Sequence, residues 1–575
     1  MLWISGFISI IFVFTTNFIN KTDYSNLGGL HSWLTGSSII FTNNWLKDGI
    51  VADKFTMLEK PYSIESQTLE SRSPYVSYPN GTILITYSIA KMLGKDQIDV
   101  RFIKILDIVF YGLDALLIGF IVYLILRYLF KIKTRKGKIF ISILLASVWI
   151  MLPNNMYYLK NVFFSDQLIL FFTCLLVLLE ILRNYAGITR SLTKNIINTL
   201  LFLTVLCGVL IDYYFWIQVF VLCIINFVDS FRQKKSFIYS LKNIAIYVIP
   251  SLLAVGIFFF QLIQINGSWL SLKNIMLTRT GHTQSPEGGG SFIRSAIGYI
   301  YNITWIKIYD VFGFLGSAFL YVSSIGSLLL LWYFKKKKQA AENLPNVFRL
   351  SLFIILPVYI QIFGLMNHSA VHEFSTLKLN ILFVFGFLLL PYIIFVWKGK
   401  TLDLALELFC KIDTFHKKTV KNSYVALVTL FAAFFIFFNI YIYRHGIFSN
   451  YEIIKGFYSG RVAMEQSSYK MESLIKEMNN YENVFFSFTD SIPKNPPHSL
   501  AITKKMVYNV NNLDDINRIF PHLDNKAVVM LVVDRNYTEK SDTILKEEQY
   551  VTENFKYVKE RNGYEIYSLN EKVTH

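Results

Sequence analysis

Residues 308–339, IYDVFGFLGSAFLYVSSIGSLLLLWYFKKKKQ, form a long apolar run that ends directly in four lysines. An apolar run of about 20 residues is long enough to cross a bilayer as a helix. Lysines that follow such a span mark the side of the membrane that faces the cytoplasm. The stretch therefore predicts a membrane-spanning helix and also the side on which that helix ends.

Similar apolar runs recur along the 575 residues, 53% of which are hydrophobic, and they predict about eleven spans. We place these spans at 2–19, 104–130, 139–157, 163–182, 196–211, 213–228, 244–264, 308–334, 348–366, 380–396 and 424–442. The net charge of +17 comes largely from short basic loops between the spans. We interpret these loops as membrane anchors, so we expect a membrane partner and no nucleic acid.

Every second loop between the spans is rich in lysine and arginine, which indicates a fixed orientation. These basic loops are 131–138, 183–195, 229–243, 335–339 and 398–422. With about eleven spans, a multi-pass protein of the cell (plasma) membrane would have a cytoplasmic N-terminus and an extracytoplasmic C-terminus. The other loops, among them a long first loop at 21–100, would then lie on the outer face.

The pattern changes after residue 442. The segments ENVFFSF (482–488) and AVVMLVVD (527–534) are rich in β-branched and aromatic residues and predict strands, whereas SDTILKEEQYVTENF (541–555) predicts a helix. The predicted fold class is therefore a polytopic α-helical membrane protein with a small extracytoplasmic α/β domain. We place the membrane domain at 1–442 and the α/β domain at 443–575.

The first outer loop holds most of the candidate chemistry. Asp23 lies four residues past the first span, where it can accept a proton as a general base; an ordinary interfacial aspartate is the alternative. His31 follows eight residues later, about two helical turns on, which puts it on the same side if that segment is helical. Glu65 is a further acid of this loop. Arg72 can bind a phosphate through its planar guanidinium, or form a surface ion pair with Glu70.

Tyr75 and Tyr78 come next, and Tyr78 begins the turn in SYPNGTIL (77–84), where proline and glycine precede an apolar helix. Asp166 in FFSDQLILFF lies at the outer end of a span, either as a catalytic acid or as a helix N-cap. The stretch NHSAVHEFSTLKLNILF adds His372 and Lys378 between two later spans. It lacks the H-E-x-x-H spacing, so we expect no zinc site there. We expect no cofactor, and the sequence leaves a divalent metal open without indicating one.

These motifs and their common face resemble the GT-C superfamily of membrane glycosyltransferases, in particular the relatives of protein O-mannosyltransferases and aminoarabinose transferases. Those families carry an essential acid near the first span and a Tyr-Pro-Pro or His-Pro-Pro turn before the second. Here the turn is Tyr78-Pro79-Asn80, without the second proline, and the first loop lacks the Asp-Glu pair of those families. The acid near the first span is Asp23. The late His372-Glu373-Phe374 stretch looks like a motif of the same families. The resemblance covers residues 1–442.

The resemblance implies an inverting transfer of a sugar from a polyprenyl-phosphate donor to an extracytoplasmic glycan, lipid or protein. Asp23, with Asp166 as a second candidate, would deprotonate the acceptor. Arg72, and with it Lys378, would bind the donor phosphate as charge develops on it. His31, Glu65, Tyr75, Tyr78 and His372 would line the substrate site.

Two other functions fit the same sequence. A transporter or lipid flippase would use Asp107 and Asp114, which lie seven residues apart on one face of the span 104–130. A non-catalytic scaffold would bind a partner through its α/β domain. The glycine-rich centre of the outer loop 266–306 either covers a site or serves as a linker.

Overall fold

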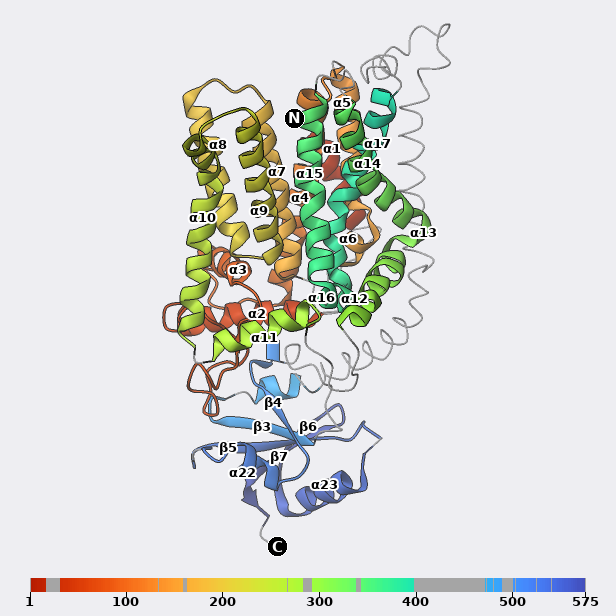
Figure 1. Cartoon of the computed structure of the whole chain (residues 1–575). Coiled ribbons are helices and arrows are strands. Elements are labelled where there is room, and N and C mark those ends of the chain that lie inside the picture. The colour runs from red at the N-terminus through yellow and green to blue at the C-terminus, as the bar shows by residue number, and fades with distance from the viewer. Residues whose placement is uncertain are drawn as a thin grey trace.

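The computed structural model describes residues 2–16, 32–132, 134–158, 163–265, 267–282, 292–337, 343–397 and 471–573, except 472, 479, 489–499, 502, 524 and 539. A bundle of long helices makes up the larger part of the molecule, and a small sheet domain lies at one end of it (Figure 1). We call that end of the bundle the outer end. This architecture confirms the predicted fold class of a polytopic helical membrane protein with a C-terminal α/β domain.

The long helices of the bundle are α1 (Leu2–Phe14), α4 (Val100–Leu124), α5 (Arg135–Ile150), α7 (Ser165–Tyr185), α8 (Ser191–Val209), α9 (Tyr213–Arg232), α10 (Phe237–Ile263), α13 (Ile308–Tyr321), α14 (Ser327–Lys336), α15 (Leu344–Gly364) and α17 (Asn380–Trp397). The other helical segments are α2 (Ser32–Asp48), α3 (Gly81–Met92), α6 (Pro153–Tyr158), α11 (Ser268–Arg279), α12 (Phe292–Tyr301), α16 (Met366–Val371) and the 3₁₀ segment η5 (Glu373–Leu379). Within the described residues, the π-helical turns η2 (Ile125–Leu129), η3 (Asn302–Lys307) and η4 (Val322–Gly326) extend or join these helices.

Eight helical stretches in the described part of the chain are long and apolar enough to cross a membrane. They are Val100–Leu129, Ser165–Tyr185, Ser191–Val209, Tyr213–Arg232, Phe237–Ile263, Val311–Lys336, Leu344–Gly364 and Phe374–Ile394. Two further expected spans appear as the shorter helices α1, of 13 residues, and α5, of 16 residues. The expected span at 424–442 lies outside the described residues, so the count of about eleven is not confirmed.

The basic loops whose position the structure describes lie together at one end of the bundle, as the alternation of charge along the sequence predicts. The basic stretches that join α7 to α8 and α9 to α10 lie at the end farthest from the sheet domain (Figure 1). The helices α2 and α11 lie across the outer end, and α2 is bonded to the start of α7 because Ser38 Oγ donates to the carbonyl oxygen of Phe163 at 2.7 Å. Which end faces the cytoplasm stays a prediction from the lysine bias.

The C-terminal domain contains one five-stranded sheet with the order β4-β3-β5-β7-β6. Its strands and helices are β3 (Asn483–Phe488), β4 (Val507–Val510), α22 (Asp514–Ile519), β5 (Val528–Asp534), α23 (Asp542–Asn554), β6 (Phe555–Arg561) and β7 (Tyr564–Lys572). β3 pairs in parallel with β4 and β5, and β7 pairs antiparallel with β5 and β6. The predicted strands 482–488 and 527–534 and the predicted helix 541–555 are confirmed. The boundary at 443 lies outside the described residues and stays a prediction.

The first outer loop packs against this sheet domain. Its Ile64 is buried in the same apolar cluster as Phe486 and Tyr508 of the sheet domain. The ammonium of Lys60 lies 5.5 Å from the ring centroid of Tyr508. Within the loop, β1 (Met57–Leu58) pairs with β2 (Pro74–Tyr75). Burial of Ile64 removes apolar surface from water, which holds the loop against the domain.

Candidate active site

The turn that begins at Tyr78 is fixed on two sides. Asn80 Nδ2 donates to the carbonyl oxygen of Phe55 at 2.8 Å. The backbone N–H of Gly81 donates to the carbonyl oxygen of Leu210 at 2.7 Å. A Cβ at Gly81 would lie 2.5 Å from that same oxygen, so the close approach of the two backbones requires glycine. The turn thereby joins the first loop to the connection between α8 and α9.

Tyr78 is the centre of a cluster of aromatic and basic side chains. Its ring is buried, and the guanidinium carbon of Arg279 lies 4.2 Å from the ring centroid. Its hydroxyl lies 3.2 Å from Nε2 of His368. The rings of Phe164 and Tyr213 lie 5.6 and 5.8 Å from the Tyr78 ring. A cation over an aromatic face is attracted by the ring's negative face, which orients Arg279 at this point.

Arg279 is the last residue of α11 and belongs to the outer loop 266–306. The end of α11 is held against α16 because Asn367 Nδ2 donates to the carbonyl oxygen of Thr278 at 2.8 Å. Nη1 of Arg279 is buried and has no hydrogen-bond partner within the described residues. A guanidinium has five N–H donors, and a buried donor without an acceptor costs about 1–3 kcal/mol. An anionic ligand at this point would supply the missing acceptor.

The phenol of Tyr75 lies in the same environment as Arg279. Burial raises the pKa of Tyr75 to about 12, although the positive charge of Arg279 acts in the opposite direction. The Tyr75 ring also packs edge-on against Phe164, with 6.1 Å between centroids. Tyr75 therefore stays neutral at physiological pH.

Lys378 joins two acids at the outer ends of two helices. Its Nζ lies 2.5 Å from Oδ1 of Asp166 and 3.3 Å from Oδ2 of Asp212, and all three side chains are at most 1% exposed. Asp212 caps α9, because its Oδ1 accepts from the N–H of Tyr214 at 2.7 Å. Burial raises the pKa of Asp212, and the ammonium of Lys378 opposes that shift. The three residues tie together the outer ends of α7, α9 and η5.

Asp166 is not the N-cap of α7, so that alternative does not hold. The cap residue is Phe164, which makes no side-chain bond to the helix, and Asp166 lies in the first turn. A carboxylate there interacts favourably with the helix dipole. Oδ2 of Asp166 has no hydrogen-bond partner within the part of the chain that the structure describes. One carboxylate oxygen is thus available beside the Lys378 pair.

His372 extends the same cluster. Its ring lies 4.7 Å from that of His368 and stacks on Phe374 at 4.9 Å. Through His368 it is connected to the hydroxyl of Tyr78. The structure therefore brings together five of the residues predicted for the site: Tyr75, Tyr78, Asp166, His372 and Lys378.

Arg72 lies elsewhere, within the first loop. Its Nη1 donates to Asp53 Oδ1 at 2.9 Å and its Nη2 donates to Asp48 Oδ2 at 2.7 Å. Its Nε donates to the carbonyl oxygen of Lys60 at 3.0 Å. The surface pair with Glu70, weighed as the alternative role, is wrong, because the loop folds back and the partners are Asp48 and Asp53. A contact between Arg72 and the donor phosphate stays a prediction.

Glu65 is not part of the Tyr78 cluster. Glu65 is buried where the first loop meets the sheet domain, with its Oε1 3.5 Å from the hydroxyl of Tyr508. Asp23 and His31 lie outside the described residues. Within the described residues, no group of three or more His, Cys, Asp or Glu side chains is arranged to hold a metal ion.

Sequence reasoning did not select several residues of the cluster, among them Arg279, Asp212, Tyr213 and His368. Asp212 carries the same signal as Asp166, since both are acids where two apolar runs meet. His368 lies in the stretch from which His372 was chosen. Arg279 had no comparable signal beyond its position in an outer loop.

A comparison with solved structures finds a similar fold. The chain is similar to ArnT from Cupriavidus metallidurans, in its structure bound to undecaprenyl phosphate, with a TM-score of 0.52 and 12% identity over 98% of each chain. The chain has the GT-C fold. The resemblance predicted from the loop motifs is thus confirmed for the fold.

A second GT-C structure is less similar. It is the oligosaccharyltransferase of Archaeoglobus fulgidus tethered with an acceptor peptide, with a TM-score of 0.49 and 10% identity. That match covers 99% of this chain and 76% of the other. No protein-family model and no curated protein matches the sequence.

Proposed function

We propose that this GT-C chain is a membrane glycosyltransferase that moves a sugar from a polyprenyl-phosphate donor to an extracytoplasmic acceptor. The observation that carries the proposal is the half-buried Arg279, which lies over Tyr78 and whose buried Nη1 is an open donor among the described residues. Asp166, which has an available carboxylate oxygen, lies in the same cluster and is joined to Asp212 by Lys378. A cation for a phosphate and an acid for a hydroxyl are the two groups that such a transfer needs.

Arg279 would bind the phosphate of the lipid donor. Charge-assisted hydrogen bonds from a guanidinium to phosphate are short and strong, and Nη1 is open to make one. The bound undecaprenyl phosphate of the similar ArnT structure supports a lipid phosphate as the ligand. Lys378 would act as a positioning residue that balances Asp166 and Asp212. A direct contact between Lys378 and the phosphate stays a prediction.

The transfer itself requires a base and a leaving group. A carboxylate would take the proton of the acceptor hydroxyl while the acceptor oxygen attacks the anomeric carbon of the sugar. The bond from that carbon to the phosphate oxygen would break, and the polyprenyl phosphate would leave with its new charge against Arg279. Attack opposite to the leaving group gives inversion. Asp23 is the proposed base, and Asp166 is the second candidate through its open Oδ2.

A second candidate function is a proton-coupled transporter or lipid flippase. Asp107 and Asp114 are both buried in α4, and neither carboxylate oxygen of Asp114 has a hydrogen-bond partner among the described residues. Ionisable groups inside a membrane bundle commonly mark ion pathways. This function would depend on Asp114 and not on Arg279.

The two functions separate in one experiment. Purified full-length protein is incubated with radiolabelled polyprenyl-phosphate sugars and a cell-envelope extract. Movement of label from the lipid to envelope material, lost in Arg279→Ala and retained in Asp114→Asn, supports the transferase. Absence of transfer with every donor, together with Asp114-dependent movement of labelled lipid across vesicles, would establish the transporter instead.

A further inference from the structure

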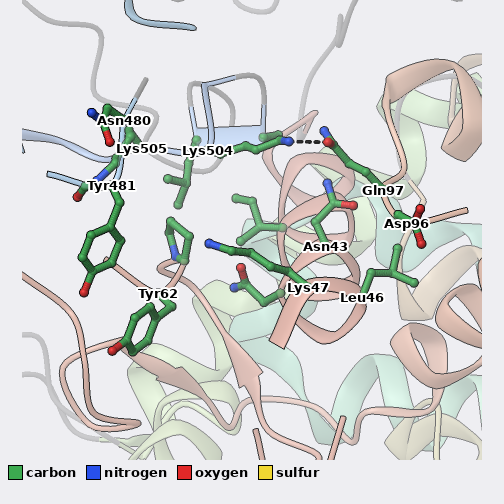
Figure 2. Close-up of a pocket in the computed structure, with 15 residues that line it drawn as sticks. Asn43, Leu46, Lys47, Tyr62, Asp96, Gln97, Asn480, Tyr481, Lys504 and Lys505 are labelled. Atoms are coloured by element: carbon green, nitrogen blue, oxygen red, sulfur yellow. Dashed lines mark hydrogen bonds between the residues drawn. The ribbon is translucent and has the colours of Figure 1, made fainter. Parts of the chain in front are cut away.

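A pocket of about 530 Å³ lies between the membrane part and the sheet domain. Its walls come from α2, from the stretches at 61–62 and 96–97, and from the sheet domain at 480–481, 500–501 and 504–505 (Figure 2). Pockets for small ligands usually have volumes of about 300–1,000 Å³. The pocket is separate from the Tyr78 cluster, since none of its lining residues belongs to that cluster.

The pocket is lined by three lysines. Lys47 and Lys504 are exposed, whereas Lys505 is buried and its Nζ donates to the carbonyl oxygen of Tyr481 at 3.2 Å. Among the described residues, none of the three forms an ion pair with a carboxylate. Asp96 is the acid of the lining, and Gln97 accepts a hydrogen bond from Lys504. The pocket is therefore positive and has donors for an anion.

Repulsion between these lysines is consistent with the excess positive charge of the pocket. Burial lowers the pKa of Lys504, and the charges of Lys476 and Lys47 lower it further. Burial also lowers the pKa of Lys505, with Lys47 acting in the same direction and the nearby Glu65 acting against it. A bound anion would relieve this repulsion, because it favours the charged form of each lysine.

Two tyrosines form one wall of the pocket. Tyr62 of the first loop and Tyr481 of the sheet domain stack with 5.8 Å between centroids and 16° between ring planes. Their exposed fractions are 40% and 42%, so ring surface is open to a ligand. Figure 2 shows both rings on the same side of the pocket, with the side chain of Lys47 across from them. An apolar ring surface beside cations suits a ligand with both a flat carbon face and a negative charge.

We propose that this pocket binds an anionic saccharide, a sugar unit that carries a phosphate or carboxylate group. Lys47 and Lys504 would bind the charged group, and Tyr62 and Tyr481 would pack against the sugar ring. An acidic peptide would engage the lysines without needing the tyrosine faces, so the stacked pair favours the saccharide. The role of this ligand as the acceptor rests on the transferase activity proposed above, whereas its binding does not.

The test is direct binding to full-length protein in lipid nanodiscs, measured by calorimetry without any donor lipid. The probes are trigalacturonate for a carboxylate sugar, glucose 6-phosphate for a phosphate sugar, maltotriose and glucose as neutral counterparts, and tetraglutamate as an acidic peptide. Three variants are compared with wild type. The first combines Lys47→Gln and Lys504→Gln, the second is Tyr481→Ala, and the third is Tyr62→Leu. Lys546→Gln and Tyr550→Ala, both exposed on α23, are the matched controls.

At least one anionic saccharide is expected to bind about tenfold or more tightly than its neutral counterpart. Which anionic probe binds distinguishes a phosphate from a carboxylate ligand. The double lysine variant and at least one tyrosine variant should bind that saccharide more weakly by a similar factor, while the control variants bind it like wild type. Equal binding of neutral sugars, no binding of either anionic sugar, or binding of tetraglutamate that is insensitive to both tyrosine variants would overturn the proposal.

Arg279→Ala keeps this test separate from the transferase. That variant should lose affinity for undecaprenyl phosphate while the anionic saccharide binds as in wild type. If transfer is never observed but the saccharide binds as described, only the proposed activity fails. If transfer occurs and the pocket variants bind every probe like wild type, only the saccharide site fails.

Discussion

Arg279 lies over the ring of Tyr78, with its guanidinium carbon 4.2 Å from the ring centroid. The contact joins two outer segments that are distant in the sequence, the end of α11 and the turn before α3. From the sequence alone, the loop 266–306 could either cover a site or serve as a linker. One described part of that loop, residues 267–282, contacts the Tyr78 cluster through Arg279, which favours a role at the site.

Removal of Lys378 should destabilise the protein. Lys378→Met leaves the carboxylates of Asp166 and Asp212 buried without a cation, which typically costs about 3–5 kcal/mol. Thermal melting in detergent should show a clear fall in Tm. Adding Asp166→Asn and Asp212→Asn to Lys378→Met should recover much of that loss, because the buried charges are gone. A Tm of wild-type value in Lys378→Met alone would show that the three residues do not form this ion group.

Asp23→Asn should abolish transfer without loss of folding, since the amide keeps the shape but cannot take a proton. Loss of a general base typically lowers the rate by about 10²-fold or more. Steady-state kinetics and melting of Asp23→Asn and Asp166→Asn, side by side, decide which acid is the base. Wild-type turnover in Asp23→Asn would exclude that residue and leave Asp166 as the candidate.

Gly81→Ala should disturb the Tyr78 turn. The new Cβ would lie 2.5 Å from the carbonyl oxygen of Leu210, so the backbones must separate, at a cost of about 1–3 kcal/mol. Both Tm and transfer should fall. Gly256→Ala in α10 is the control, because a Cβ there meets nothing within 4 Å. Equal effects of the two substitutions would mean that the close contact at Gly81 has no special role.

The buried pair of Arg72 and Asp53 predicts a pH dependence of stability. Burial raises the pKa of Asp53 to about 6, despite the attraction of Arg72. Because the folded pKa exceeds the unfolded value of 3.8, the contribution of Asp53 is fully present below pH 3.8 and is lost as pH rises through about 6. The Tm of wild type relative to Asp53→Asn should therefore fall between pH 4 and 6. A constant difference would contradict this assignment.

The long spans were predictable because a helix in lipid needs an uninterrupted apolar sequence, which a sequence displays directly. The contacts between spans were not. Asp166, Asp212 and Lys378 meet only because α7, α9 and η5 pack with their outer ends together, and no local pattern encodes that packing. The lysine bias predicted that the two acids lie at the same end of the bundle, and it gave no partner for either.

Two other misses have local causes. Glu70 was the nearest acid to Arg72 in sequence, but the β1–β2 pair folds the loop so that Asp48 and Asp53 are nearer in space. Strand β6 was not predicted because six of its seven residues in FKYVKER are exposed and several are charged. That composition is common in an edge strand, where charge discourages pairing with another chain.

The central claim, that Arg279 binds the donor phosphate of a glycosyl transfer, is tested most directly by kcat/KM for label transfer from a polyprenyl-phosphate sugar. Arg279→Ala should lower kcat/KM by about 10²-fold or more, and Arg279→Lys, which keeps the charge but loses the planar fork, should lie between it and wild type. Lys273→Ala, an exposed change on the same helix, should match wild type. Equal kcat/KM for wild type and Arg279→Ala would contradict the account.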